Sequence, residues 1–151
     1  MELIAKDPDF VGRVRASFAR QQVMHTLAVE MVRIVPGEIE LAMPYAPGFT
    51  QQHGYIHAGI ISTVLDSACG YAAFSLMPAE AAVLTVEFKI NLVAPAKGDR
   101  FTFSARVVKP GKTLTVCEGR AYASDGDGEQ RLIATMTGTL MALFDREGLK
   151  H

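Results

Sequence analysis

The sequence predicts an α+β fold in which an antiparallel sheet curls around one central helix. About six segments have the alternation or the β-branched composition of strands, and short turn sequences separate several of them. One long segment, residues 58–76, has instead an apolar stripe with the period of an α-helix. A sheet with a single buried helix satisfies both patterns by packing the helix against one of its faces.

Length and composition predict a single globular domain over residues 1–151, because 49% of the residues are hydrophobic and 21% are charged. The formal net charge of −1 lacks the basic excess that is typical of nucleic-acid-binding proteins. No apolar run reaches the ~18 residues that cross a bilayer, and the first residues do not resemble a secretory signal. We therefore expect a cytoplasmic protein, in which Cys69 and Cys117 are buried free thiols rather than a disulfide.

The first element expected is a helix over residues 8–20. Phe10, Val14 and Phe18 recur at helical spacing, with arginines around them. Asp7 is placed to cap this helix, and the following proline suits the first helical turn. The predicted fold therefore has an N-terminal helix in addition to the central one.

Strict period-two alternation predicts strands near residues 39–43, 84–92 and 101–107, each with one covered and one solvated face. In the second of these, one face carries Leu84, Val86, Phe88, Ile90 and Leu92, and the other carries Thr85, Glu87, Lys89 and Asn91. Less regular strands are expected near residues 24–34, 113–123 and 130–143. Turns at Pro36-Gly37, Pro110-Gly111 and Ser124-Asp125-Gly126-Asp127-Gly128 make successive strands antiparallel.

The central helix has two unlike faces. Its apolar stripe consists of Ile60, Ile61, Val64, Leu65, Ala68, Cys69 and Ala72. Asp66 falls on the far side, among the small residues Gly59, Ser62, Thr63 and Gly70. A solvated helix face normally carries Lys, Glu and Arg, so we expect this small face to be buried closely against another surface. A carboxylate there is costly unless it is paired or used; the alternative is a structural acid bonded to a hydroxyl such as Ser62.

The start of this helix is a candidate site for a developing negative charge. His57, Ala58 and Gly59 lie where the chain enters the helix, so their backbone N–H groups include donors without helical partners. Such donors, with the positive end of the helix dipole, stabilise an oxyanion. The alternative for His57 is a helix-entry residue that only bonds the backbone.

Other common sites are absent from the sequence. It has no Gly-x-Ser-x-Gly elbow, no phosphate-binding glycine loop and no dinucleotide fingerprint. His25, His53, His57 and His151 lack metal-ligand spacing, so no metal is expected. The Asp125–Gly128 stretch lacks the acidic residue that closes a calcium loop, since position 136 is Met136, and is interpreted as a hairpin turn.

Two stretches make the sequence similar to a known family. Residues Gln51 to Gly70, and Thr85-Val86-Glu87-Phe88-Lys89-Ile90-Asn91 followed by Ala94-Pro95-Ala96, resemble the PaaI-like acyl-CoA thioesterases of the hotdog fold. The resemblance extends over about residues 24–143, which is the expected core of the domain. It implies hydrolysis of acyl-CoA to free acid and CoA without a cofactor. It also implies a homodimer or a dimer of dimers (a homotetramer) in which each active site lies between subunits, with the acidic residue facing the other chain.

The same resemblance assigns roles to individual residues. Asp66 takes the place of the family's catalytic carboxylate, which is a nucleophile or a general base. Ala58 takes the place of the glycine whose N–H binds the thioester oxygen; alanine still supplies that N–H but reaches positive φ less easily. Gln51 matches a side chain that positions the carbonyl or water, His57 one that orients the substrate, and Thr85 a hydroxyl that holds the water.

The resemblance also implies where CoA binds. The turn Gly111-Lys112-Thr113 looks like the loop that touches the CoA nucleotide or its phosphates; the alternative is a plain hairpin turn. The acyl pocket is expected to be lined by Tyr55, Tyr71, Phe74 and Met77, which permits aryl or medium-chain acyl groups. Two other functions remain open: a non-catalytic acyl-CoA-binding protein, and a dehydratase or hydratase of the same fold acting on acyl thioesters.

Overall fold

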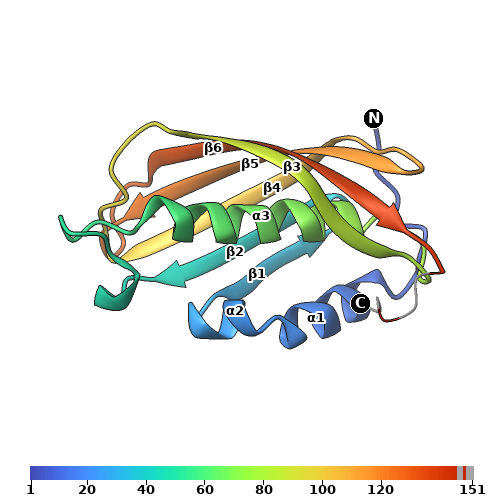
Figure 1. Cartoon of the computed structure of the whole chain (residues 1–151), viewed down its shortest axis with the longest axis horizontal. Helices are drawn as coiled ribbons and strands as arrows, with labels where there is room; N and C mark the ends of the chain where they lie inside the picture. Colours follow the sequence, from blue (N-terminus) through green and yellow to red (C-terminus); the bar gives the residue numbers. More distant parts are fainter. Residues whose placement is uncertain (146–147, 149–151) are drawn as a thin grey trace.

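The central helix α3 (Ala58–Phe74) lies across a six-stranded antiparallel sheet that curls around it (Figure 1). The computed structural model describes residues 1–145 and 148, and the strand order within them is β1-β2-β4-β5-β6-β3. The strands are β1 (Glu30–Val35), β2 (Glu38–Pro44), β3 (Ala82–Leu92), β4 (Arg100–Lys109), β5 (Leu114–Ser124) and β6 (Arg131–Leu143). This is the hotdog fold, and it confirms the predicted α+β class with a central helix.

The three predicted turn sequences each join neighbouring antiparallel strands, β1 to β2, β4 to β5 and β5 to β6. Gly37 in the first turn has a φ of 78°, where a side chain is strained, and an added Cβ there would meet Leu3. Its N–H donates to the Ser75 hydroxyl at 2.8 Å, just beyond the end of α3. The turn therefore ties the edge of the sheet to the carboxyl end of the central helix.

The apolar stripe of α3 is packed closely against the middle of the sheet. Val64, Leu65 and Ala68 have no exposed surface. On β5, Gly119 leaves room for the helix, since a Cβ there would lie 3.1 Å from Leu65 Cδ2 and 3.2 Å from Cys69 Sγ. Cys69 and Cys117 are buried free thiols, as expected, and burial raises the pKa of both.

The N-terminal helix is present, with bounds that differ from the prediction. Helix α1 (Phe10–Arg20) begins after Asp9, and the predicted cap at Asp7 is wrong: the Asp7 carboxylate accepts the Asp9 N–H at 2.9 Å, before the helix begins. Residues 24–34 are not one strand: α2 (Gln22–Thr26) precedes β1. Met24 and Leu27, three residues apart and both buried, suit a helical turn better than an alternating strand.

Arg13 holds helix α1 against the carboxyl end of α3. Its Nη2 donates to the Met77 carbonyl at 2.7 Å and to the Phe74 carbonyl at 3.2 Å. Its guanidinium carbon lies 4.2 Å from the centroid of the Phe74 ring, and its Nε pairs with Asp7 at 2.8 Å. These contacts fix α1 beside the carboxyl end of α3.

The edge strand β3 departs from its predicted alternation through a β-bulge at Val86. Its pairing with β6 places Thr85 opposite Leu140 and Phe88 opposite Gly138, two residues apart and therefore on one face. Phe88 thus shares the α3 side of the sheet with Thr85, where strict alternation predicted opposite faces. The bulge is the physical reason for the difference.

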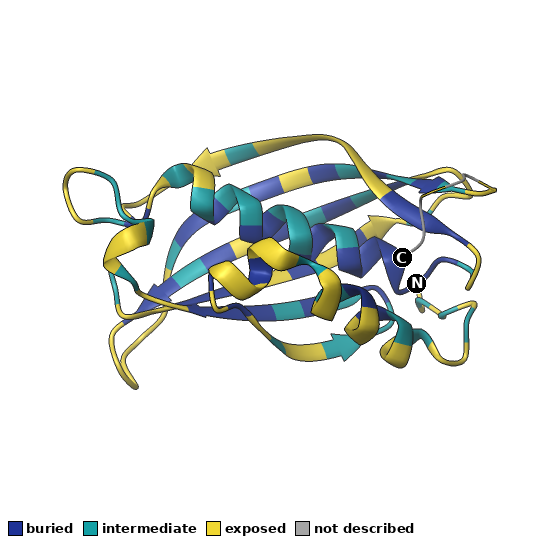
Figure 2. Ribbon diagram, turned by 60° about the horizontal axis from the view of Figure 1, so that its bottom comes forward, coloured by how far each residue is buried: buried dark blue, intermediate teal, exposed yellow. Residues whose placement is uncertain are grey.

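One side of α3 and most of β3 are uncovered in the single chain. The small face of α3, at Gly59, Ser62, Thr63, Asp66 and Gly70, is half-exposed or exposed in the single chain, so the chain itself does not supply the surface that was predicted to cover it. Phe88 and Leu92 on β3 are 42% and 55% exposed, and Figure 2 shows this strand exposed along most of the upper edge. A long apolar edge strand beside an uncovered helix face is typical of a surface that a second chain covers.

Candidate active site

The start of α3 presents one unused backbone donor. The His57 N–H donates to the Phe49 carbonyl at 2.9 Å, and the Gly59 N–H donates to His57 Nδ1 at 2.8 Å. Within the described residues, the N–H of Ala58 has no acceptor. Of the three backbone N–H groups expected as oxyanion donors, only that of Ala58 is free among residues 1–145 and 148. His57 caps the helix: its Nδ1 accepts the Gly59 N–H and is therefore unprotonated, so Nε2 carries the proton.

Gln51 lines the same cavity as Ala58, and its amide is held in one orientation. Its Oε1 accepts the N–H groups of His53 at 2.6 Å and Tyr55 at 3.3 Å. The amide nitrogen is left without an acceptor in the described part of the chain. A second hydrogen-bond donor is thus available on a residue that lines the same cavity as Ala58.

These groups line a cavity of about 540 Å³ between the start of α3 and the end of β3. Gln51, His57 and Ala58 form its polar side. The remaining lining residues are Tyr55, Ile56, Ile61, Leu92, Val93, Ala94, Pro95, Ala96 and Ile133. Tyr55 therefore contributes to this cavity, and the walls around the free N–H are mainly apolar.

Asp66 lies further along α3, half-buried, and accepts a hydrogen bond from the Thr85 hydroxyl at 2.8 Å. The hydroxyls of Ser62 and Thr63 bond carbonyls of their own helix instead, so the partner of the carboxylate comes from the bulged strand β3. Burial raises the pKa of Asp66, and the hydrogen bond from Thr85 offsets part of that rise.

A second cavity, of about 280 Å³, adjoins this carboxylate. Tyr71 lines it and is otherwise buried, with its hydroxyl bonded to Ser17 and to the amide of Gln21. Gln21 also lines the cavity. It was not predicted from the sequence, because a lone glutamine near a helix end belongs to no recognisable site motif. Phe74 is completely buried, so it does not form the pocket wall that was expected of it.

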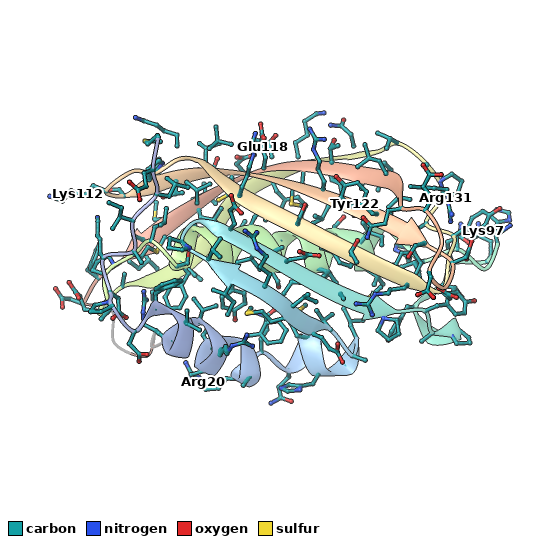
Figure 3. All side chains as sticks on the ribbon, turned by 180° about the vertical axis from the view of Figure 1, so that it is seen from behind. Arg20, Lys97, Lys112, Glu118, Tyr122 and Arg131 are labelled. Atoms are coloured by element: carbon teal, nitrogen blue, oxygen red, sulfur yellow. The ribbon has the colours of Figure 1, made fainter. Side chains whose placement is uncertain are left out.

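The turn Gly111-Lys112-Thr113 lies at the other end of α3 from Ala58. Gly111 and Lys112 line a third cavity with Leu76, Met77 and the N-terminal residues, which is also where Met77 is found. Figure 3 shows Lys112 at one end of the molecule and Lys97 and Arg131 at the other. An added Cβ on Gly111 would collide with the Leu114 carbonyl, which explains the glycine in this turn.

The donor and the carboxylate do not meet within one chain. Asp66 follows Ala58 by eight residues on the same helix, about 12 Å along the axis at ~1.5 Å per residue. Groups that act together on one reacting atom lie within ~3 Å of it. The chain thus carries two separate halves of a site, one at Ala58 and Gln51 and one at Asp66 and Thr85.

The described residues include no candidate metal site and no helix that could span a membrane. No group of three or more His, Cys, Asp or Glu among them is placed to hold a metal ion, and His151 lies outside the described residues. No helix in the described part of the chain is long and apolar enough to span a membrane. The Asp125–Gly128 stretch is a hairpin turn, with the Gly126 N–H bonded to Asp99.

Comparisons with known proteins find similarity to thioesterases and esterases. The family model described as "Thioesterase superfamily" matches residues 53–129. A crystal structure of a thioesterase family protein from Silicibacter pomeroyi is 64% identical, with a TM-score of 0.88, and covers 89% of this chain and 98% of that one. The PaaI protein of Escherichia coli, from the phenylacetic acid degradation operon, shares the fold at 19% identity and a TM-score of 0.79 over 89% and 93% of the two chains. A Saccharolobus solfataricus protein named "Putative esterase" is 30% identical over 85% of this chain and 83% of its own.

The Thr85–Asp66 hydrogen bond predicts that substitution of Thr85 changes the pKa of Asp66. The hydroxyl stabilises the ionised carboxylate, so Thr85→Ala is expected to raise the Asp66 pKa further, while Thr85→Ser retains the wild-type value. The ionised fraction of Asp66 at a given mildly acidic pH then falls in the alanine variant. Carboxyl-carbon NMR titration measures this directly, with Thr63→Ala as the control, because Thr63 bonds the Gly59 carbonyl instead. An unchanged Asp66 pKa in Thr85→Ala would contradict the assignment.

Proposed function

The chain belongs to the thioesterase superfamily, and we propose that it hydrolyses acyl-CoA thioesters to a free acid and CoA. The observation that carries the proposal is the unpartnered N–H of Ala58 at the positive end of α3, on a residue that lines a mainly apolar cavity. A donor placed there stabilises the negative charge that develops on a thioester oxygen during attack. Hydrolysis of this kind draws on side chains and backbone alone, so the proposal includes no metal or redox cofactor.

The proposed active site combines the two halves from two subunits. If two α3 helices lie antiparallel with their small faces together, Asp66 of each subunit comes level with Ala58 of the other. Ala58 and Asp66 are separated by the same distance of about 12 Å along α3 in each subunit. A single antiparallel arrangement therefore forms both sites at once. The uncovered face of α3 and the exposed apolar edge of β3 support a homodimer of this kind, alone or as part of a tetramer.

The chemistry follows from these positions. The thioester oxygen accepts hydrogen bonds from the Ala58 N–H and the Gln51 amide. Asp66 of the partner subunit either removes a proton from water or attacks the carbonyl carbon itself. Thr85 of the partner subunit orients that carboxylate through its hydrogen bond. On the general-base path the water oxygen forms the new C–O bond, the C–S bond breaks, and the departing thiolate takes up the proton that the carboxylate removed. On the nucleophilic path the carboxylate forms a mixed anhydride as the C–S bond breaks, and water then hydrolyses the anhydride, which releases the acid, protonates the thiolate and restores the carboxylate.

The CoA phosphates are proposed to contact Lys112 and its turn. These belong to the subunit that supplies Asp66 and lie at the end of its α3 opposite its own Ala58.

Two free buried thiols are consistent with a reducing compartment, and we therefore propose that this hydrolysis takes place in the cytoplasm.

Asp66→Asn is expected to lower kcat by about 10²–10⁴-fold, because an amide is neither a useful base nor a useful nucleophile. Its melting temperature at neutral pH should equal or exceed that of the wild type. The folded-state pKa of Asp66 is raised, so ionising it costs stability as the pH rises through its pKa, and asparagine avoids that cost. CoA release and thermal unfolding are measured on the same preparation, with the exposed Asp127→Asn as a control. A folded Asp66→Asn protein with wild-type kcat would refute the mechanism.

Ala58→Pro removes the proposed oxyanion donor and little else. Ala58 is the first residue of α3, where proline is favoured, and His57 has the φ of −59° and ψ of 138° that a following proline requires. We expect kcat to fall about 10²–10³-fold with an unchanged melting temperature. Ala58→Gly keeps the N–H and should retain activity within a few-fold. Equal kcat for the proline and glycine variants would show that this N–H does not act in catalysis.

The same two inactive variants locate the site. A heterodimer of one Asp66→Asn chain and one Ala58→Pro chain, co-expressed with different tags and purified, contains one site with both groups intact. It should regain about half of the wild-type activity per dimer. If Ala58 and Asp66 acted within one chain, every site of the heterodimer would lack one group and the activity would stay at the level of the single variants.

A further inference from the structure

Gln21 is held in a defined position against the middle of α3. It lies between α1 and α2, where its extended φ of −82° and ψ of 97° interrupt the helical path. Its Nε2 donates to the Tyr71 hydroxyl at 3.1 Å, and its Oε1 accepts the Ser67 hydroxyl at 2.6 Å. The side chain therefore bridges two residues of α3 that follow Asp66.

These contacts make Gln21 part of a fixed wall of the cavity beside Asp66. Tyr71 is braced from a second direction by the Ser17 hydroxyl at 3.2 Å, and its ring packs edge-on against Phe18 at 5.8 Å between centroids. The other lining residues are Asp66, Ser67, Gly70, Val83, Leu84, Thr85 and Leu140. The cavity has the carboxylate and Thr85, apolar sides from the strands, and a hydrogen-bonded polar wall in which Gln21 bonds Ser67 and Tyr71 of α3.

The two cavities differ in what they can accept from an acyl-CoA. The thiol side of the substrate ends in a charged nucleotide, which is too costly to bury, so the pantetheine arm must lead to solvent. The larger cavity at Ala58, of about 540 Å³, suits that arm. The cavity at Asp66, of about 280 Å³, is left for the acyl group and is slightly smaller than the ~300–1,000 Å³ of pockets that hold drug-sized ligands.

We propose that Gln21 is a specificity-determining residue that limits the length of the acyl group. This rests on the proposed thioesterase function. An apolar chain long enough to reach Gln21 would have to separate its amide from Ser67 and Tyr71, leaving buried polar groups unpaired. The substrate class is therefore acyl groups of short to medium chain length or with a single ring, and long fatty acyl groups are excluded.

The test measures kcat/KM for straight-chain acyl-CoAs from butyryl to palmitoyl. Gln21→Ala opens the wall, so the ratio for dodecanoyl-CoA over butyryl-CoA should rise by about tenfold or more, the effect of one or more methylenes in an apolar pocket. Gln21→Met keeps the length of the side chain without its hydrogen bonds and should shift the ratio less. Gln22→Ala is the matched control, since Gln22 is the neighbouring residue of the same type and is exposed; its profile should equal that of the wild type.

The outcomes separate this inference from the function on which it rests. Wild-type hydrolysis with a chain-length profile that Gln21→Ala leaves unchanged would overturn the role of Gln21 alone. Wild-type activity that is greatest with palmitoyl-CoA would overturn it as well. No hydrolysis of any acyl-CoA by the wild type would overturn both proposals. If Gln21→Ala does not fold, as judged by thermal unfolding, Gln21→Asn shortens the side chain by one methylene and gives the same test with a smaller shift.

Discussion

The way in which α3 lies on the sheet is the constraint on which the rest of the structure depends. Its apolar stripe is packed so closely against β5 that a side chain at Gly119 would crowd Leu65 and Cys69. This seating fixes the rotation of the helix about its axis. Asp66 and the small residues around it must then face away from the covered stripe, toward the one side that the chain itself leaves open. The position of the carboxylate is therefore a consequence of core packing.

The edge strand β3 converts this packing into a site. Without the bulge at Val86, residues 88, 90 and 92 would lie on the opposite face from Thr85. With it, the strand brings the Thr85 hydroxyl to Asp66 and also presents Phe88 and Leu92 on the α3 side. The strand thus supplies a partner for the carboxylate and an apolar surface for a second chain from one irregularity in its pairing. The proposed site and the proposed dimer contact are linked by this geometry.

Much of the fold could be predicted from local patterns, because the turn sequences and the alternation in β2 and β4 report burial directly. The bulge could not be predicted, since Val86 fits the strict alternation of polar and apolar residues around it, and alternation alone gives no sign of an extra residue. The same limit applied to residues 24–34, where apolar composition does not separate the short helix α2 from a strand. In the site, the helix-start motif indicated Ala58 and Asp66. The family resemblance indicated Thr85 as a hydroxyl that holds the water, but its hydrogen bond to Asp66 was not predicted. That bond and the position of Gln21 depend on tertiary contacts between distant segments, which leave no local signal.

The surroundings of the acidic residues show how Asp66 differs from structural acids in this chain. Asp7 pairs with Arg13 and also accepts a backbone N–H, and Asp99 accepts the Gly126 N–H with both oxygens. Asp66 is half-buried and, within the described residues, has the Thr85 hydroxyl as its hydrogen-bond donor, with no cation paired to it. A carboxylate that receives so little compensation for lost solvation keeps lone pairs available to accept a proton or to attack an electrophile. Asp7 and Asp99 are therefore satisfied by their partners, whereas Asp66 keeps acceptor capacity, which is what its proposed role as a catalytic carboxylate requires.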